Sequence, residues 1–172
     1  MIKITGSTSF KISKRDIRII REYTKYVLGR FVTPSVLKKS RIIINITHQK
    51  DVKDSKEKKD LSKFSAWCIY EGIVSRKRQF SITLSSHRIN RRSKNQLTKL
   101  KNLLMDLGHE LVHVKQYLNN ESFDYVNGDT RFKGKIFSNW EEGENYYFSP
   151  WEIEAYGYAQ GLYVCFLEKF KD

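Results

Sequence analysis

The sequence is poor in cysteine, proline and long apolar runs, and each shortage excludes a class of protein. Two cysteines, Cys68 and Cys165, are too few for a disulfide framework and favour a reducing compartment. Two prolines and nine glycines exclude collagen-like and low-complexity chains. Apolar runs as short as Ile42-Ile43-Ile44 come nowhere near a membrane span, and the N-terminus lacks the pattern of a secretory signal. We therefore expect a cytoplasmic protein that does not act at a membrane.

The chain has ample apolar residues and an uneven charge. Its 172 residues are 40% hydrophobic and 13% aromatic, enough for the core of one domain. The net charge is +13, but residues 1–101 hold 26 basic and 7 acidic side chains, whereas residues 102–172 hold 6 and 12. This asymmetry predicts either a basic face for an anionic partner, such as DNA or an acidic protein, or merely a well-solvated lysine-rich surface.

Hydrophobic spacing predicts an α+β chain in which one helix and a small sheet precede two further helices. The first helix is expected over 14–30, with Ser13 as its cap. Three strands are expected over 41–48, 64–71 and 79–86, with a charged loop over 49–63.

The strongest predicted helix covers 95–118. Its apolar residues recur at spacings of three and four and form one stripe: Leu97, Leu100, Leu104, Leu107, Leu111, Val114 and Leu118. The polar segment 119–149 is expected to contain a hairpin or flap near Asn127-Gly128. Ser149-Pro150 then favours a last helix over 151–170.

The sequence His109-Glu110-Leu-Val-His113 is a HExxH motif inside the strongest helix. Two histidines four residues apart lie on one helical face, so their imidazoles can bind a single metal ion. Neither His109 nor His113 belongs to the apolar stripe, which argues against a packing role. Zinc suits such ligands and leaves a coordination position open, and Glu110 can act as the general base.

A third ligand is expected from the start of the last helix. Glu152 and Glu154 both lie there, but a two-residue separation points them to different faces, so only one can face the metal. Glu152 shares its face with Ala155 and Ala159, whose small size permits close helix packing. Glycines accompany Glu154 in the same way, so the small residues alone leave both open. We favour Glu152, in part because of the family resemblance described below.

Together, His109-Glu-Leu-Val-His113, Gln116 and Pro150-Trp-Glu-Ile-Glu-Ala155 resemble the zincin metallopeptidases of the gluzincin type. The chain is most similar to small metallopeptidase-like proteins of phages and bacteria, and more distantly to SprT-like proteases that act on DNA-associated proteins. In many gluzincins a small residue and then an acidic one follow the ligand glutamate at the third and fourth positions. Ala155 meets this pattern and Tyr156 departs from it.

The resemblance implies a minimal zincin-like domain spanning 1–172. Its parts are a basic helix and sheet of three or more strands (1–96), an active-site helix (97–118), a flap-like insertion (119–149) and a third-ligand helix (150–170). It also implies a host-cell cytoplasmic location if the protein is viral.

By the same resemblance, the chain is a zinc metallopeptidase that cleaves a protein or peptide. The ligands are His109, His113 and Glu152, and Glu110 activates a zinc-bound water. We expect Tyr156 to donate to the oxyanion, with Tyr146 and Tyr147 as further candidates. The strand over 79–86 is expected to align the substrate at a sheet edge.

Other interpretations stay open from the sequence alone. Residues 73–101 hold nine basic side chains and no acidic one, so the chain could be a basic nucleic-acid-binding module with a structural or vestigial metal site. No recognised nucleic-acid motif accompanies them. A metal-dependent hydrolase of another bond is a third possibility. Gln116 is expected either in the cleft or at the surface, and Cys68 and Cys165 are expected in the core.

Overall fold

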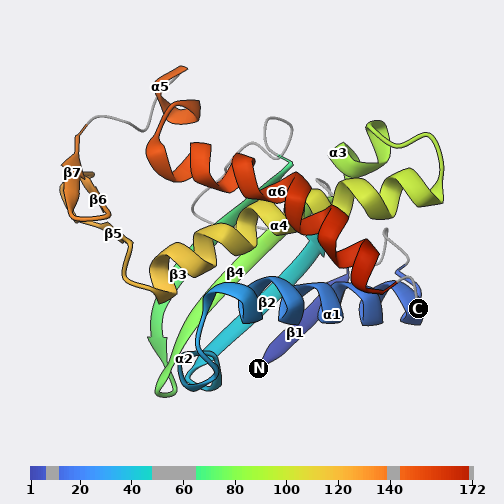
Figure 1. Ribbon diagram of the computed structural model, residues 1–172, viewed down its shortest axis with the longest axis horizontal. Coiled ribbons are helices and arrows are strands. Elements are labelled where there is room, and N and C mark those ends of the chain that lie inside the picture. Colours follow the sequence, from blue (N-terminus) through green and yellow to red (C-terminus); the bar gives the residue numbers. More distant parts are fainter. Residues whose placement is uncertain (7–11, 48–64, 139–143, 171–172) are drawn as a thin grey trace.

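The computed structural model describes residues 1–6, 12–47, 65–138 and 144–170. The charged loop expected over 49–63 lies outside these residues. The described part is an α+β arrangement of one four-stranded sheet, one small three-stranded sheet and several helices (Figure 1).

The main sheet contains the three predicted strands and one that the sequence analysis missed. Its order is β1 (Ile2–Gly6), β2 (Ser40–Thr47), β4 (Lys77–Ser85) and β3 (Ala66–Val74). Strands β1, β2 and β4 run parallel, and β3 is antiparallel to β4. The short β1 has only two apolar residues, Ile2 and Ile4, too few for a periodic signal.

The register of β2 and β4 explains the predicted alternation. Ile44 of β2 is opposite Ile82 of β4, and the flanking pairs are Ile42 with Phe80 and Ile46 with Leu84. All of these side chains are buried, whereas their neighbours along β2 are only partly so. Side chains two residues apart share a sheet face, so this face forms the floor of the core.

The position of β4 contradicts one expectation. This strand pairs with β2 on one side and β3 on the other, so its main chain has no free edge for a substrate strand. Strand β4 is not outermost because β3 folds back beside it as a hairpin.

Helices α1 (Lys14–Phe31) and α4 (Gln96–Leu118) lie over one face of the sheet, and α6 (Pro150–Lys169) packs against α4 (Figure 1). The predicted cap of α1 is confirmed, since the Ser13 hydroxyl accepts from the Asp16 main-chain N–H at 3.0 Å. Short helices α2 (Pro34–Lys38), α3 (Ser86–Arg91) and α5 (Glu144–Tyr147) were not predicted.

The apolar stripe of α4 is confirmed apart from its first member. Leu104, Leu107 and Leu111 are buried in the core, but Leu97 is 77% exposed because it lies in the first turn, beyond the sheet contacts. Asn95 caps the helix by accepting from the Thr98 main-chain N–H at 2.9 Å.

The polar insertion forms a small antiparallel sheet of β5 (Ser122–Asp124), β6 (Thr130–Phe132) and β7 (Lys135–Phe137). This sheet lies beyond the C-terminal end of α4 (Figure 1). One cysteine prediction is wrong: Cys165 is exposed on α6, whereas Cys68 packs partly against the core. Among the described residues, no helix is both long and apolar enough to cross a membrane.

Candidate metal centre

Two histidines of α4 and one carboxylate of α6 converge. The Nε2 atoms of His109 and His113 are 3.2 Å apart. Glu152 places Oε2 at 3.1 Å from His109 Nε2 and Oε1 at 3.1 Å from His113 Nε2. Residues 39 positions apart in sequence therefore meet at one point, and they are the one His/Cys/Asp/Glu group in the described chain with metal-ligand geometry.

Small residues on α6 bring this carboxylate close to α4. Ala155 is fully buried and Ala159 nearly so, both on the face of α6 that packs against α4. A helix pair with small residues at its contact can approach closely enough for a glutamate to reach the neighbouring helix. Glu152 itself is only 2% exposed, in the first turn of α6, where the helix dipole favours negative charge.

The spacing of the three groups fits a tetrahedral metal ion. Zinc–nitrogen and zinc–oxygen bonds of about 2.0–2.1 Å place neighbouring ligand atoms roughly 3.3 Å apart. The two histidine nitrogens, 3.2 Å apart, and the contact of each with one Glu152 oxygen at 3.1 Å are close to this value, and one donor atom from each residue lies within 4.8 Å of the others. Imidazole and carboxylate are also the donor types that zinc accepts, and three protein ligands leave one coordination position open.

Glu154 lies in a different environment. Its Oε1 accepts from Lys115 at 3.0 Å and from Lys133 at 2.9 Å, and its Oε2 accepts from the Gln116 amide at 2.9 Å. On its helical face, a Cβ built on Gly157 or Gly161 would meet no neighbouring element within 4 Å. Of the two candidate carboxylates, the structure therefore brings only Glu152 to the histidines.

The charges of the three converging groups stabilise one another. Burial opposes protonation of His113, but its hydrogen bond to Glu152 and the charges of Glu110 and Glu152 outweigh this and raise its pKa to about 9. Burial likewise opposes ionisation of Glu152, but both histidines together hold its pKa well below the usual range. Without a metal, protonated His113 and ionised Glu152 therefore form a buried ion pair. A divalent cation that binds here must displace the proton of His113.

Glu110 lies on α4 between the histidines and is 4% exposed. Burial raises its pKa, and the charges of Glu152 and Asp106 act in the same direction against those of His109 and His113. A carboxylate with a raised pKa is better suited to accept and return a proton near neutral pH.

Two tyrosines border the same space. The Tyr156 ring lies against that of His109, with centroids 4.4 Å apart, and its side chain is half-exposed. Tyr146 of α5 is more buried; burial, the charge of Glu152 and a hydrogen bond to Glu152 raise its pKa. The charge of Glu110 also contributes to the raised pKa of both Tyr146 and Tyr156. Tyr147, the third candidate, is exposed and packs edge-on against Tyr146.

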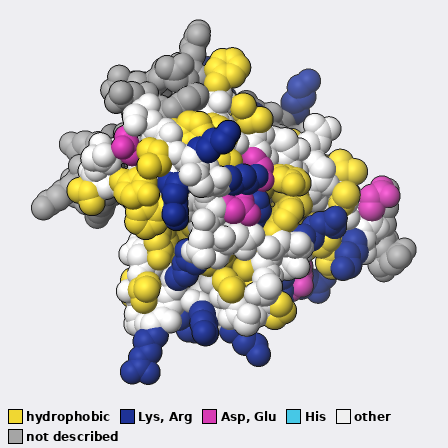
Figure 2. Space-filling model, turned by 60° about the vertical axis from the view of Figure 1, so that its left-hand side comes forward, with side chains coloured by type: hydrophobic (Ala, Val, Ile, Leu, Met, Phe, Trp, Pro, Cys, Tyr) yellow, Lys and Arg dark blue, Asp and Glu magenta, His cyan; other side chains and the backbone are white. Residues whose placement is uncertain are grey.

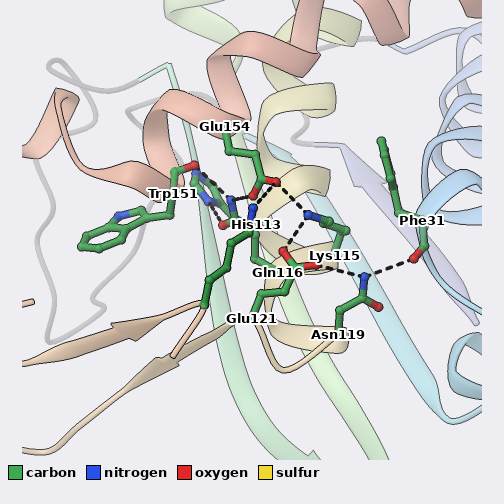
Figure 3. A network of polar contacts seen from close by, with 9 residues as sticks. Phe31, His113, Lys115, Gln116, Asn119, Glu121, Trp151 and Glu154 are labelled. Carbon is green, nitrogen blue, oxygen red and sulfur yellow. Dashed lines mark hydrogen bonds and ion pairs between the residues drawn. The ribbon is translucent and has the colours of Figure 1, made fainter. Parts of the chain in front are cut away.

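Gln116 is neither a cleft residue nor a surface amide. It is 1% exposed, and its Oε1 lies 2.9 Å from Nδ1 of His113 (Figure 3). Glu152 contacts the other nitrogen of this ring, Nε2. The only sequence signal for this role is its spacing, since a residue three positions after His113 lies on the same helical face.

Comparison of the chain with protein-family models, with curated proteins and with solved structures found no match. The geometry of the site therefore carries the functional argument.

Proposed function

We propose that this chain is a zinc-dependent metallopeptidase with His109, His113 and Glu152 as ligands and Glu110 as the general base. The observation that carries the proposal is the convergence of three donor groups from two helices, with a buried carboxylate beside them. The Nε2 atoms of the two histidines are 3.2 Å apart, and each lies 3.1 Å from one oxygen of Glu152. A HExxH helix alone supplies two ligands, and the packing of α6 supplies the third.

Bound zinc would polarise the substrate carbonyl and lower the pKa of a coordinated water. Glu110 then takes a proton from the attacking water and returns it to the leaving amine. Its buried position limits competing solvent, and the charges of His109 and His113 act on its carboxylate. Tyr146 and Tyr156 are the two candidate donors to the developing oxyanion.

A substrate strand can be placed on β3 rather than on β4. Within the described residues, the outer edge of β3 pairs with no strand. Strand β3 packs against α4, the helix that carries Glu110. Main-chain pairing along this edge would present an extended peptide to the site.

The test combines metal analysis with hydrolysis of unfolded protein substrates. We expect the purified protein to hold one zinc per chain and to lose hydrolysis in a chelator. Glu110→Gln should keep the zinc and lose at least about 100-fold in rate, the usual scale of general-base catalysis. Hydrolysis that persists undiminished in this variant contradicts the mechanism, and a protein without zinc contradicts the metal site.

A nucleic-acid-binding module with a structural metal is the alternative from a different class. The observation behind it is the excess of 26 basic over 7 acidic residues in 1–101. On the face shown in Figure 2, lysine and arginine side chains are scattered among apolar ones rather than gathered in one patch. Binding of duplex DNA whose affinity falls steeply with salt would favour this alternative, and no binding at low salt would end it.

A further inference from the structure

The Gln116 side chain joins both ligand-bearing helices at the metal centre. Its Oε1 is 2.9 Å from His113 Nδ1 on α4. Its Nε2 donates to the main-chain oxygen of Trp151 at 3.0 Å and to Glu154 Oε2 at 2.9 Å, both on α6. Trp151 immediately precedes Glu152, so one amide contacts the ring of the second ligand and the backbone next to the third (Figure 3).

The partners of Gln116 fix which way its amide faces. A main-chain carbonyl can only accept a hydrogen bond, so the group that faces Trp151 must be the NH2 group. The NH2 group has two protons, and Glu154 accepts the second. The carbonyl oxygen of the amide is therefore left to face His113, and in this orientation it can only accept.

The fixed amide in turn selects the tautomer of His113. Because Oε1 of Gln116 accepts, Nδ1 of His113 must carry the proton. The lone pair of the neutral ring then lies on Nε2, the atom 3.1 Å from Glu152 and 3.2 Å from His109 Nε2. A flipped amide would place its oxygen against the Trp151 carbonyl oxygen and the Glu154 carboxylate, which are both acceptors, so both hydrogen bonds to α6 would be lost.

Charged neighbours hold the amide in place. Glu154 is itself held by Lys115 at 3.0 Å and Lys133 at 2.9 Å, and Lys115 also contacts Glu121 at 2.6 Å. Figure 3 shows this chain of contacts running from His113 through Gln116 to Glu154 and Lys115. The β6–β7 turn, where Lys133 lies, is thereby tied to the metal centre.

We propose that Gln116 is a positioning residue that presents Nε2 of His113 to the metal and sets the distance between the ligands of α4 and α6. The proposal rests on the proposed zinc site and adds to it the residue that keeps its second imidazole in the binding tautomer. Outer-shell partners of this kind typically contribute about 10- to 100-fold to metal affinity.

The experiment compares Gln116→Met, which keeps the length of the side chain and removes its hydrogen bonds, with Leu118→Ala as a control. Leu118 is equally buried on the same turn of α4 but packs in the core. Zinc affinity is measured by competition with a chromophoric chelator, and the visible spectrum of the cobalt-substituted protein reports ligand geometry. We expect Gln116→Met to bind zinc about 10- to 100-fold more weakly, with an altered cobalt spectrum. Leu118→Ala should lower stability but keep both properties.

Wild-type affinity and spectrum in Gln116→Met, or equal weakening in both variants, would overturn the proposal while leaving the zinc site intact. A wild-type protein that binds no zinc overturns the proposed function and this inference together. If Gln116→Met does not fold, nitrogen-15 NMR of the zinc-loaded wild type decides. A slowly exchanging proton on Nδ1 of His113 supports the proposal, and a proton on Nε2 overturns it.

Discussion

The contact between Gly108 and Tyr23 allows a sharp test of how α1 and α4 pack beside the candidate metal centre. Gly108 immediately precedes His109, and a Cβ built on it would lie 2.4 Å from the Tyr23 hydroxyl oxygen. Tyr23 is fully buried, with its ring edge-on to Phe166 at 5.0 Å between centroids, so it cannot swing aside. An alanine at position 108 must therefore push the two helices apart.

The expected change in the free energy of unfolding combines two effects. Alanine gains about 1 kcal/mol over glycine in a helix interior. Overpacking a buried contact costs about 1–3 kcal/mol, so Gly108→Ala should be destabilised by up to about 2 kcal/mol.

Replacing Tyr23 with Phe removes the clashing atom. The next nearest atom of the ring is 3.4 Å from the added Cβ, an ordinary contact. The Tyr23 hydroxyl also has no hydrogen-bond partner among the described residues, so its removal leaves no group unpaired. In the Tyr23→Phe background, Gly108→Ala should therefore stabilise by about 1 kcal/mol.

Urea unfolding of the four proteins, with a chelator present to remove metal linkage, measures the coupling between the two sites. We expect a coupling energy of about 1–3 kcal/mol, set by the overpacking that Tyr23→Phe relieves. The same effect of Gly108→Ala in both backgrounds would refute the packing at this contact.

Three further predictions concern the site. Glu152→Gln should weaken zinc binding far more than Glu154→Gln, because only Glu152 reaches the histidines; metal titration that ranks them the other way contradicts the ligand set. Zinc affinity should rise about tenfold per pH unit between pH 6.5 and 8.5. The pKa of His113 is raised to about 9, so in this range zinc must displace a proton from that ring. A zinc affinity that stays constant above pH 7 contradicts this. If Tyr146 donates to the oxyanion, Tyr146→Phe should lower kcat by about 100-fold with little change in KM, and the same loss in Tyr156→Phe instead would assign that role to Tyr156.

Local patterns predicted the elements that have strong periodicity or a clear cap. The stripe of α4, the alternation of β4 and the Ser13 cap each depend on residues within one element, so they can be recognised without the fold. The short strand β1 and the helices α2, α3 and α5 were missed because elements this short hold too few residues to show a hydrophobic period. Cys165 was misplaced because its burial depends on which face of α6 has a neighbour.

The HExxH pair was determined by the sequence because both histidines belong to one helix, whose geometry fixes their separation. The sequence did not decide between Glu152 and Glu154, because both lie at the start of the same helix and small residues accompany each of them. Only the packing of Ala155 and Ala159 against α4 turned one carboxylate to the histidines and left the other with the lysines. The interior position of β4 and the contact of Gln116 with two helices were likewise decided by tertiary structure, because each depends on segments distant in sequence meeting in space.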